Sequence, residues 1–387
     1  MDIRLKPVRE QVMVVTGASS GIGLATAREA AKRGARVVLA ARDEPALGRV
    51  VGEIRARGGD AVYVVADVAD PEQVHAVAEA AVAEYGGIDS WVNNAGVSIY
   101  GLLEDTVLED ARRLFDVNYW GTVHGCLAAL PQLRHHGGAL INVGSIASDR
   151  AMPIQGHYGA SKHAIKGFTD ALRVELQHEG APVSVTLVKP GAIDTPFPHH
   201  ARNLLEHEPR HPHPVYRPET VARAILFCAE HPRRSVTVGG GGRLNAMMGI
   251  LAPDLADRVM HGMFDSQRRD EPARTPRRDT LYQPPLENGY TRGDQPGYVM
   301  RTSVYTQAAL RPARTALALA ALGGLAALVI AGSRRHEEEV EAEVRLEPGA
   351  EEGGAAAASS PGHAEWAAGD HALRDAAPLS GGRGTLR

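Results

Sequence analysis

The sequence predicts an α/β domain of the doubly wound kind, built around a parallel sheet. Seven short runs rich in β-branched residues alternate with longer segments of helical period, and several runs are almost entirely apolar. Apolar runs of this kind suit parallel strands buried on both faces, and the intervening segments are long enough for crossover helices. The predicted strands are Val12–Val15, Arg36–Ala41, Ala61–Val65, Ser90–Val92, Ala139–Val143, Val183–Val188 and Ser235–Val238.

Composition excludes several classes of protein. The 387 residues suffice for two or more domains, and 44% hydrophobic with 23% charged residues is ordinary for a globular chain. A net charge of −4 gives no argument for nucleic acid as a partner. The two cysteines, Cys126 and Cys228, lie in apolar surroundings and are expected in the core. The charged N-terminus lacks the apolar region of a secretory signal.

A glycine-rich turn follows the first predicted strand directly. Thr16–Gly23 reads TGASSGIG and leads into a helix expected over Leu24–Arg33. Glycines let the backbone turn tightly and approach a pyrophosphate, and the helix start offers free N–H groups. A purely structural turn is the alternative, but the position between a buried strand and a helix favours dinucleotide binding.

The end of the second strand bears on the choice of dinucleotide. NAD sites usually carry an acidic residue there, whereas this chain has Ala41 followed by Arg42. Arg42 can pair with a 2′-phosphate, which favours NADP and makes NAD the less expected cofactor. A surface arginine is the alternative, and Asp43 could weaken the effect by pairing with Arg42.

Polar residues follow the third and fourth strands. Asp67, in Asp67-Val68, could reach an adenine amine, or it could cap the helix that begins near Pro71. Asn93-Asn94-Ala95-Gly96 could stabilise a strand end and leave room for a cofactor, or form a plain turn.

Two further positions suggest proton chemistry. Asn118 lies inside a helix-like run, Glu109 to Leu130, where asparagine is unfavourable unless it has a role such as a polar relay. Ser145 ends the fifth strand, at the sheet edge where such folds bind ligands.

Tyr158 and Lys162 lie four residues apart in a predicted helix, on one face. A cation beside a phenol should lower the tyrosine pKa from about 10 and fit it for acid–base work. An ordinary solvated pair is the alternative.

Together, Thr16–Gly23, Asn93–Gly96, Asn118, Ser145 and Tyr158–Lys162 resemble the motifs of the short-chain dehydrogenase/reductase family, in its compact branch. Pro190-Gly191 and Thr195 match as well, and the resemblance covers roughly residues 11–242. It implies a Rossmann-type sheet of seven strands in the order 3-2-1-4-5-6-7, in a homo-oligomer. It also implies a catalytic set of Asn118, Ser145, Tyr158 and Lys162. The implied cofactor contacts are Gly17, Ser19, Ser20, Gly21, Ile22, Gly23, Arg42, Asp67, Val68, Asn94, Ala95, Gly96, Tyr158, Lys162, Pro190, Gly191 and Thr195.

The resemblance implies hydride transfer between nicotinamide and a carbonyl or secondary alcohol, with Tyr158 as acid/base, Ser145 holding the substrate oxygen and Asn118 anchoring a water that leads to Lys162. A dinucleotide-binding sensor or scaffold without turnover is one alternative. A nucleotide-sugar epimerase of the family's larger branch is another, disfavoured by the short substrate region.

The segment 196–216 corresponds to the family's substrate lid and holds five histidines. They are His199, His200, His207, His211 and His213. Prolines predict an irregular loop, and without thiolates or a helical His-x3-His pair we expect no metal.

The predicted domain ends near residue 265. Residues 266–307 have a linker-like composition, and Thr315–Gly332 forms 18 residues without a charge between flanking arginines. We expect 308–335 to hold a transmembrane helix, with a packed helix as the alternative, and 336–387 to be a disordered tail. The catalytic domain would then be cytoplasmic and membrane-attached, which would suit a lipophilic substrate.

Overall fold

The computed structural model describes residues 3–273, 279–285, 289–313, 315–328 and 330. Contacts divide the chain into a compact unit, Met1–Ala320, and a second unit, Ala321–Arg387. The sheet and the candidate site both lie in the first unit.

Seven parallel strands form the central sheet in the order β12-β7-β6-β4-β1-β2-β3. Their bounds are Val12–Thr16 (β1), Arg36–Ala41 (β2), Asp60–Val65 (β3), Ser90–Asn93 (β4), Gly138–Val143 (β6), Val183–Pro190 (β7) and Ser235–Val238 (β12). The doubly wound, seven-stranded sheet is therefore confirmed, and each strand lies within two residues of its predicted bounds. The order of the strands reverses between β1 and β4, where sheets of this kind bind ligands.

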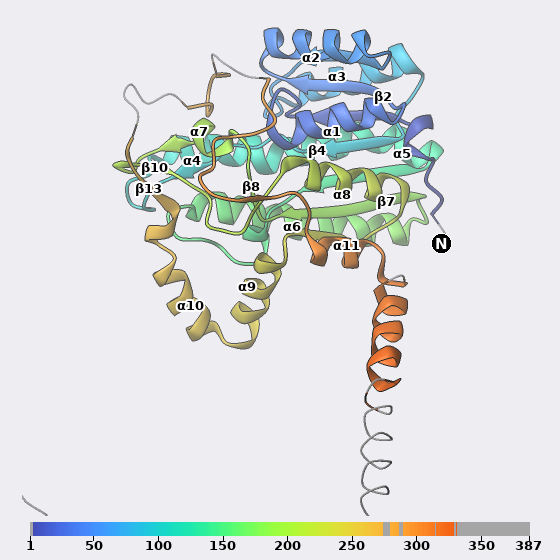
Figure 1. Ribbon diagram of the computed structural model, residues 1–387. Coiled ribbons are helices and arrows are strands. Elements are labelled where there is room, and N and C mark those ends of the chain that lie inside the picture. Colours follow the sequence, from blue (N-terminus) through green and yellow to red (C-terminus); the bar gives the residue numbers. More distant parts are fainter. Residues whose placement is uncertain (1–2, 274–278, 286–288, 314, 329, 331–387) are drawn as a thin grey trace, which may run out of the picture. The chain divides into compact units, whose positions relative to one another are not determined.

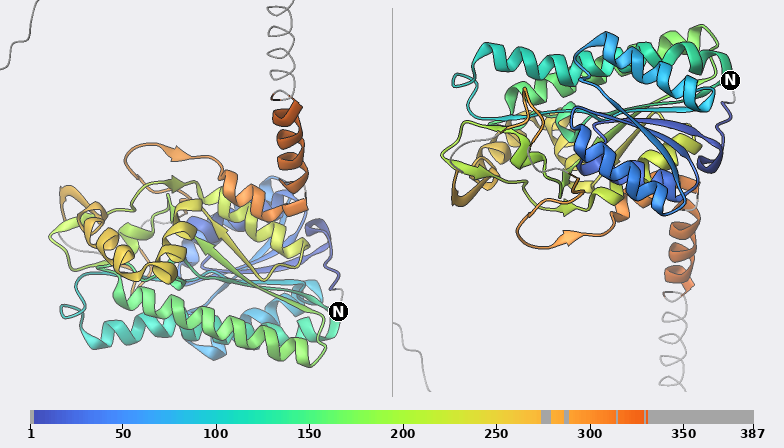
Figure 2. Two further views of the ribbon diagram at one scale, coloured as in Figure 1. Left: turned by 90° about the horizontal axis from the view of Figure 1, so that it is seen from below. Right: turned by 90° about the horizontal axis from the view of Figure 1, so that it is seen from above.

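Alternate residues of each strand enter two separate cores, one on each face of the sheet. Val15 and Leu39 pack in the first core, whereas their neighbours Val14 and Val38 pack in the second. Helices α1, α2 and α8 cover the first face and α3 to α6 cover the second (Figures 1 and 2). Burial on both faces explains why the strands are almost entirely apolar.

The helices that cover the sheet are α1 (Gly21–Lys32), α2 (Glu44–Ala56), α3 (Pro71–Tyr85), α4 (Leu108–Phe115), α5 (Gly121–His136), α6 (Gly156–His178) and α8 (Pro218–Glu230). Two of them begin at an aspartate. Asp43 accepts a hydrogen bond from the Ala46 amide, and Asp70 accepts from Glu72 and Gln73. Asp43 therefore caps α2, and the cap of α3 is Asp70 rather than Asp67.

Short elements surround the carboxyl edge of the sheet. They are β5 (Ile99–Tyr100), β8 (Ala192–Ile193), α7 (Phe197–His200), β9 (Arg202–Asn203), β10 (His207–Pro209), β11 (Val215–Tyr216), α9 (Gly240–Leu251), α10 (Pro253–Gly262), β13 (Arg268–Pro272), β14 (Val299–Met300) and α11 (Val304–Leu310). The strands among them form three small sheets, β10-β13, β14-β11-β8 and β5-β9. The elements between β7 and α8 thus build the predicted loop region next to the site.

Several described residues of the predicted linker 266–307 pack on the domain. Leu281 is fully buried in the second core, and Ser303 and Thr306 are buried as well. In Figure 1 this part of the chain runs back past β8 before it reaches α11. A few buried anchors are enough to order a segment whose average composition is poor in core-forming residues.

The predicted membrane helix, 308–335, is described only in part. In the part of the chain that the structure describes, no helix combines the length and apolar character needed to cross a bilayer. The predicted tail, 336–387, lies outside the described residues.

Candidate active site

The glycine turn connects the end of β1 to the start of α1. Gly17 and Gly21 have φ of +64° and +54°, a region that favours glycine. A Cβ on Gly23 would lie 2.2 Å from the Gly17 carbonyl oxygen, so the helix packs directly on the turn. The turn therefore presents backbone N–H groups at a helix start, an arrangement that binds anions.

Asn94 fixes the turn to the end of the neighbouring strand β4. Its side-chain amide donates to the carbonyls of Thr16 at 3.0 Å and Gly17 at 3.3 Å. The Thr16 hydroxyl in turn accepts from the amides of Asn94 and Ala95. Asn94 thus holds two strand ends together, and Asn93 is bound within the core to Asn142 at 2.9 Å.

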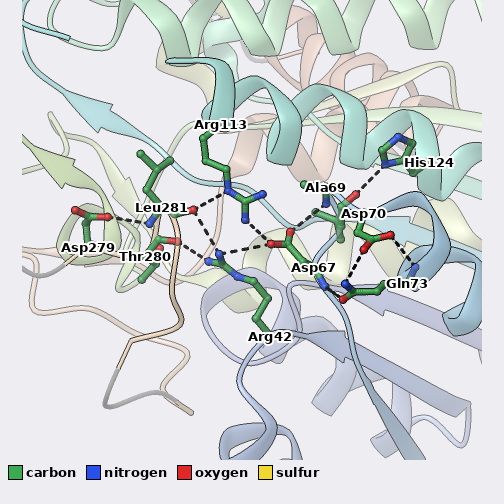
Figure 3. A network of polar contacts seen from close by, with 11 residues as sticks. Arg42, Asp67, Ala69, Asp70, Gln73, Arg113, His124, Asp279, Thr280 and Leu281 are labelled. Carbon is green, nitrogen blue, oxygen red and sulfur yellow. Dashed lines mark hydrogen bonds and ion pairs between the residues drawn. The ribbon is translucent and has the colours of Figure 1, made fainter. Parts of the chain in front are cut away.

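Arg42 lies beyond the end of β2, within a cluster of polar groups (Figure 3). Its guanidinium donates to the carbonyls of Thr280 and Leu281 and lies 3.9 Å from the Asp67 carboxylate. Arg113, on α4, pairs directly with Asp67 and donates to the Leu281 carbonyl at 3.1 Å. Two arginines therefore share the Asp67 carboxylate, while Asp43, which lines the same cavity as Arg42, caps α2.

Asn118 does not lie in a continuous α-helix. The predicted run divides into α4, a π-helical turn at Asp116–Trp120 and α5. The Asn118 amide accepts from Val97 N at 2.8 Å and donates to Val97 O and to Ser161 Oγ, both at 3.0 Å. The wider turn aims this amide inwards, and such turns are frequent at functional sites.

Lys162 and Tyr158 both lie on α6. The Lys162 side chain is buried, and its ammonium donates to the Val143 carbonyl at 3.0 Å while lying 5.7 Å from the centre of the Tyr158 ring. A Cβ on Gly96 would lie 3.3 Å from Asn118 Oδ1 and 3.6 Å from Lys162 Nζ, so these groups surround Gly96. The pair is therefore not an ordinary solvated one.

The pKa of Tyr158 differs from the expected lowering. Burial raises the pKa of Tyr158 to about 12, against a smaller lowering by a hydrogen bond with Ser145. Burial also lowers the pKa of Lys162 to about 8. Removal from water outweighs the hydrogen bond with Ser145, so the phenol is neutral at pH 7.

One cavity of about 230 Å³ joins these groups. Predicted residues that line it are Gly17, Ser19, Ser20, Gly21, Ile22, Arg42, Asp67, Val68, Asn94, Ala95, Gly96, Ser145, Tyr158, Lys162, Pro190, Gly191 and Thr195. Asn118 and Gly23 do not line the cavity themselves but contact residues that do, Val97 and Gly17 respectively. The glycine turn, the start of α1 and Arg42 thus line one cavity, and their N–H and guanidinium groups suit the phosphates of a nicotinamide dinucleotide.

The cavity also has walls that the sequence did not reveal. Met152, Gln155 and Phe197 line it near Tyr158, and Thr280, Pro284 and Pro285 line it from the C-terminal side. Gln155 donates to the Ser98 hydroxyl at 3.1 Å. The sequence could have indicated Gln155, because it lies three residues before Tyr158 at the start of the same helix. Thr280, Pro284 and Pro285 belong to no recognisable motif, so nothing in the sequence indicates that they reach the cavity.

In the histidine-rich segment, His199 lies against two carboxylates. His199 contacts Asp294 and lies 3.5 Å from Glu208, and burial lowers the pKa of His200 and of His211 to about 4. Within the described ranges, no group of three or more His, Cys, Asp or Glu side chains is placed to hold a metal ion. His200 and His211 line the cavity as neutral rings.

Comparison with known proteins decides the family. The family described as short chain dehydrogenase matches residues 11–204. An uncharacterized oxidoreductase of Bacillus subtilis, YxnA, is 45% identical over 329 residues, which cover 84% of this chain and 92% of the relative. The chain belongs to the short-chain dehydrogenase family.

Two solved structures with cofactors are similar to the chain. A short-chain dehydrogenase/reductase of Burkholderia phymatum in complex with NAD has a TM-score of 0.55 and 28% identity, covering 70% of this chain and 98% of its own. L-Sorbose reductase of Gluconobacter frateurii, complexed with NADPH and L-sorbose, has a TM-score of 0.52 and 27% identity, covering 62% and 97%. The chain is thus an oxidoreductase with a nicotinamide dinucleotide as cofactor.

Proposed function

We propose that the protein interconverts a carbonyl compound and a secondary alcohol, with NADP as the preferred dinucleotide and Tyr158 as the acid/base. The observation that carries this proposal is that Ser145, Tyr158 and Lys162 line the same cavity as the glycine turn and Arg42. Proton-transfer groups and a phosphate cradle are therefore within reach of one bound pair of molecules.

The nicotinamide supplies the hydride when it is bound. The neutral phenol of Tyr158 donates its proton to the carbonyl oxygen, and its raised pKa keeps that proton in place at neutral pH. The Ser145 hydroxyl, which is hydrogen-bonded with Tyr158, holds the same oxygen. Lys162 stabilises the phenolate that the transfer leaves. Asn118 is held in place by its hydrogen bonds to Val97 and to Ser161, the residue before Lys162.

The NADP preference rests on the charges beside β2. The guanidiniums of Arg42 and Arg113 lie beside the Asp67 carboxylate, and Arg42 lines the cavity, where it could pair with a 2′-phosphate. The two similar solved structures do not decide between NAD and NADP, since one is in complex with NAD and the other with NADPH.

The substrate side of the cavity favours a lipophilic molecule. Met152, Ile193 and Phe197 line the cavity together with Tyr158, and the Phe197 ring lies 5.7 Å from the Tyr158 ring, centre to centre. Apolar walls with a few convergent polar groups are typical of sites for small apolar ligands.

A screen of carbonyls and alcohols against NADPH and NADH, followed by absorbance, tests the proposal. We expect turnover of a lipophilic ketone or secondary alcohol, and faster turnover with the phosphorylated dinucleotide. Binding of either dinucleotide without turnover across the whole panel would favour the sensor or scaffold instead.

Membrane attachment and assembly stay predictions. Attachment through 308–335 rests on the uncharged stretch Thr315–Gly332, and salt-resistant, detergent-sensitive membrane fractionation would test it. Assembly into a homo-oligomer finds support in the apolar residues Leu244, Ile250 and Leu251 of α9, which are at least 70% exposed, and light scattering would test it.

A further inference from the structure

The C-terminal extension contributes a wall to the cofactor cavity. We use the name clasp for its described residues 279–285 and 289–297. Thr280, Pro284 and Pro285 of the clasp line the cavity, on the side of Arg42 and Asp67. The clasp therefore belongs to the site, although it lies far from every site motif in the sequence.

One end of the clasp is anchored beside Arg42 (Figure 3). Leu281 is fully buried in the second core, and its carbonyl accepts from Arg113 Nε at 3.1 Å and Arg42 Nη1 at 3.4 Å. The Tyr282 hydroxyl donates to Asp110 Oδ1 at 3.0 Å. Apolar burial and charge-assisted bonds thus hold this end in place.

The other end of the clasp is anchored on the glycine turn. The Gly21 amide donates to the Tyr290 carbonyl at 2.9 Å, and the Gly289 amide donates to the Ser19 carbonyl at 3.1 Å. Further along, a Cβ on Gly293 would lie 2.5 Å from the Thr195 carbonyl oxygen, so the clasp passes in close contact with that loop.

The clasp covers the cavity without filling it. Ile22, the residue after Gly21 at the start of α1, still lines the cavity, as do Arg42 and Asp67. The remaining volume of about 230 Å³ is below the roughly 300–1,000 Å³ of ordinary ligand pockets. The Tyr290 carbonyl also occupies the Gly21 amide, so a pyrophosphate that uses this amide has to displace the clasp outward as it enters.

We propose that the clasp closes over the bound dinucleotide and controls the rate at which it leaves. This inference rests on the proposed function, because it requires that the cavity binds the dinucleotide. It assigns Leu281 and Tyr282 as residues that position the clasp.

The release rate of NADPH from the full chain tests the clasp. NADPH fluorescence is followed after mixing the complex with excess NADP. We expect Leu281→Ala to speed release by about tenfold or more, because differences in affinity between variants of one site appear mainly in dissociation. Leu310→Ala is the matched control, since Leu310 is a buried leucine of the same extension outside the cavity, and its release rate should equal that of the wild type.

Tyr282→Phe keeps the test informative where loss of Leu281 prevents folding. It removes only the bond to Asp110 and should speed release by a smaller factor, about twofold to fivefold. Equal release rates for wild type, Leu281→Ala and Tyr282→Phe would overturn the clasp while leaving the proposed function intact. Failure of the wild-type chain to bind NADPH or NADH would instead overturn the proposed function.

Discussion

Lys162 is a buried lysine, with only 4% of its surface exposed to solvent. Burial lowers the pKa of its ammonium group from 10.5 to about 8, so between those two values the unfolded chain binds the proton and the folded chain releases it. Stability therefore rises as pH increases from about 8 to about 10.5, and below pH 8 the folded protein bears the full cost of the buried charge.

Lys162→Met should therefore stabilise the protein without cofactor at pH 7 while removing activity. We expect a gain of about 1–3 kcal/mol in the free energy of unfolding, reduced by the lost bond to Val143. The gain should shrink as pH rises towards 10. Urea unfolding of both proteins at pH 7 and pH 10 measures it, and a variant less stable than wild type at pH 7 would contradict the account.

Arg42→Ala should shift the choice of dinucleotide. Loss of a charge-assisted contact to the 2′-phosphate is expected to lower kcat/KM for NADPH by about tenfold to a hundredfold and to leave that for NADH nearly unchanged. Steady-state kinetics with both dinucleotides measures the shift, and equal losses for the two would show that Arg42 does not read the phosphate.

Residues predicted as one site from spacing do meet in the structure, because the carboxyl ends of adjacent parallel strands share one edge. Ser145 follows β6 at that edge, and α6 brings Tyr158 and Lys162 to the same cavity. Arg113 could not be predicted, since nothing in its local sequence indicates that α4 brings it to Asp67. The raised pKa of Tyr158 was also beyond prediction, because burial cannot be judged from spacing.

At the scale of elements, the contact between the glycine turn and α1 makes a sharp prediction. Gly23→Ala places a methyl group 2.2 Å from the Gly17 carbonyl oxygen and should cost about 1–3 kcal/mol or more, with loss of dinucleotide binding. Thermal unfolding and NADPH fluorescence measure both effects.

Gly52→Ala provides the matched control. Gly52 is an exposed residue within α2, and a Cβ there meets no atom within 4 Å. This change should stabilise the protein by about 0.5–1 kcal/mol, because alanine has the higher helix propensity, and binding should not change. The same loss in both variants would contradict the close packing of α1 on the turn.

The predicted helix is divided at Asn118 by a π-helical turn, and the hydrogen bonds of this one residue explain the turn. Asparagine in a helical run indicated a special role, but the π-helical turn Asp116–Trp120 that aims it at Val97 has no signature of its own. Only the tertiary bonds to Val97 and Ser161 explain why the wider turn persists.

At the scale of the whole molecule, the sheet was predictable and the extension was not. Strands that are buried on both faces have nearly continuous apolar sequences, which can be recognised. The segment from 279 onwards instead has isolated buried residues such as Leu281 among prolines, glycines and charged residues. Isolated anchors cannot be told from a linker by composition, because their partners are supplied by distant parts of the domain.

Removal of the extension should weaken the domain. A chain ending at Asp265 loses buried Leu281 and Leu310 and exposes the core surfaces beneath them. Since cutting one buried leucine to alanine costs about 2–5 kcal/mol, we expect a clearly lower midpoint of thermal unfolding than for a chain ending at Ala320. Equal midpoints for the two chains would show that the extension contributes nothing to the stability of the domain.

The most direct test of the central claim is the turnover of Tyr158→Phe on a substrate found by the screen. The variant keeps the ring and removes the proton donor, so kcat/KM should fall by about 10²–10⁴-fold while the dissociation constant for NADPH stays within about twofold of wild type. Turnover within about tenfold of wild type would contradict the assignment of Tyr158 as the acid/base.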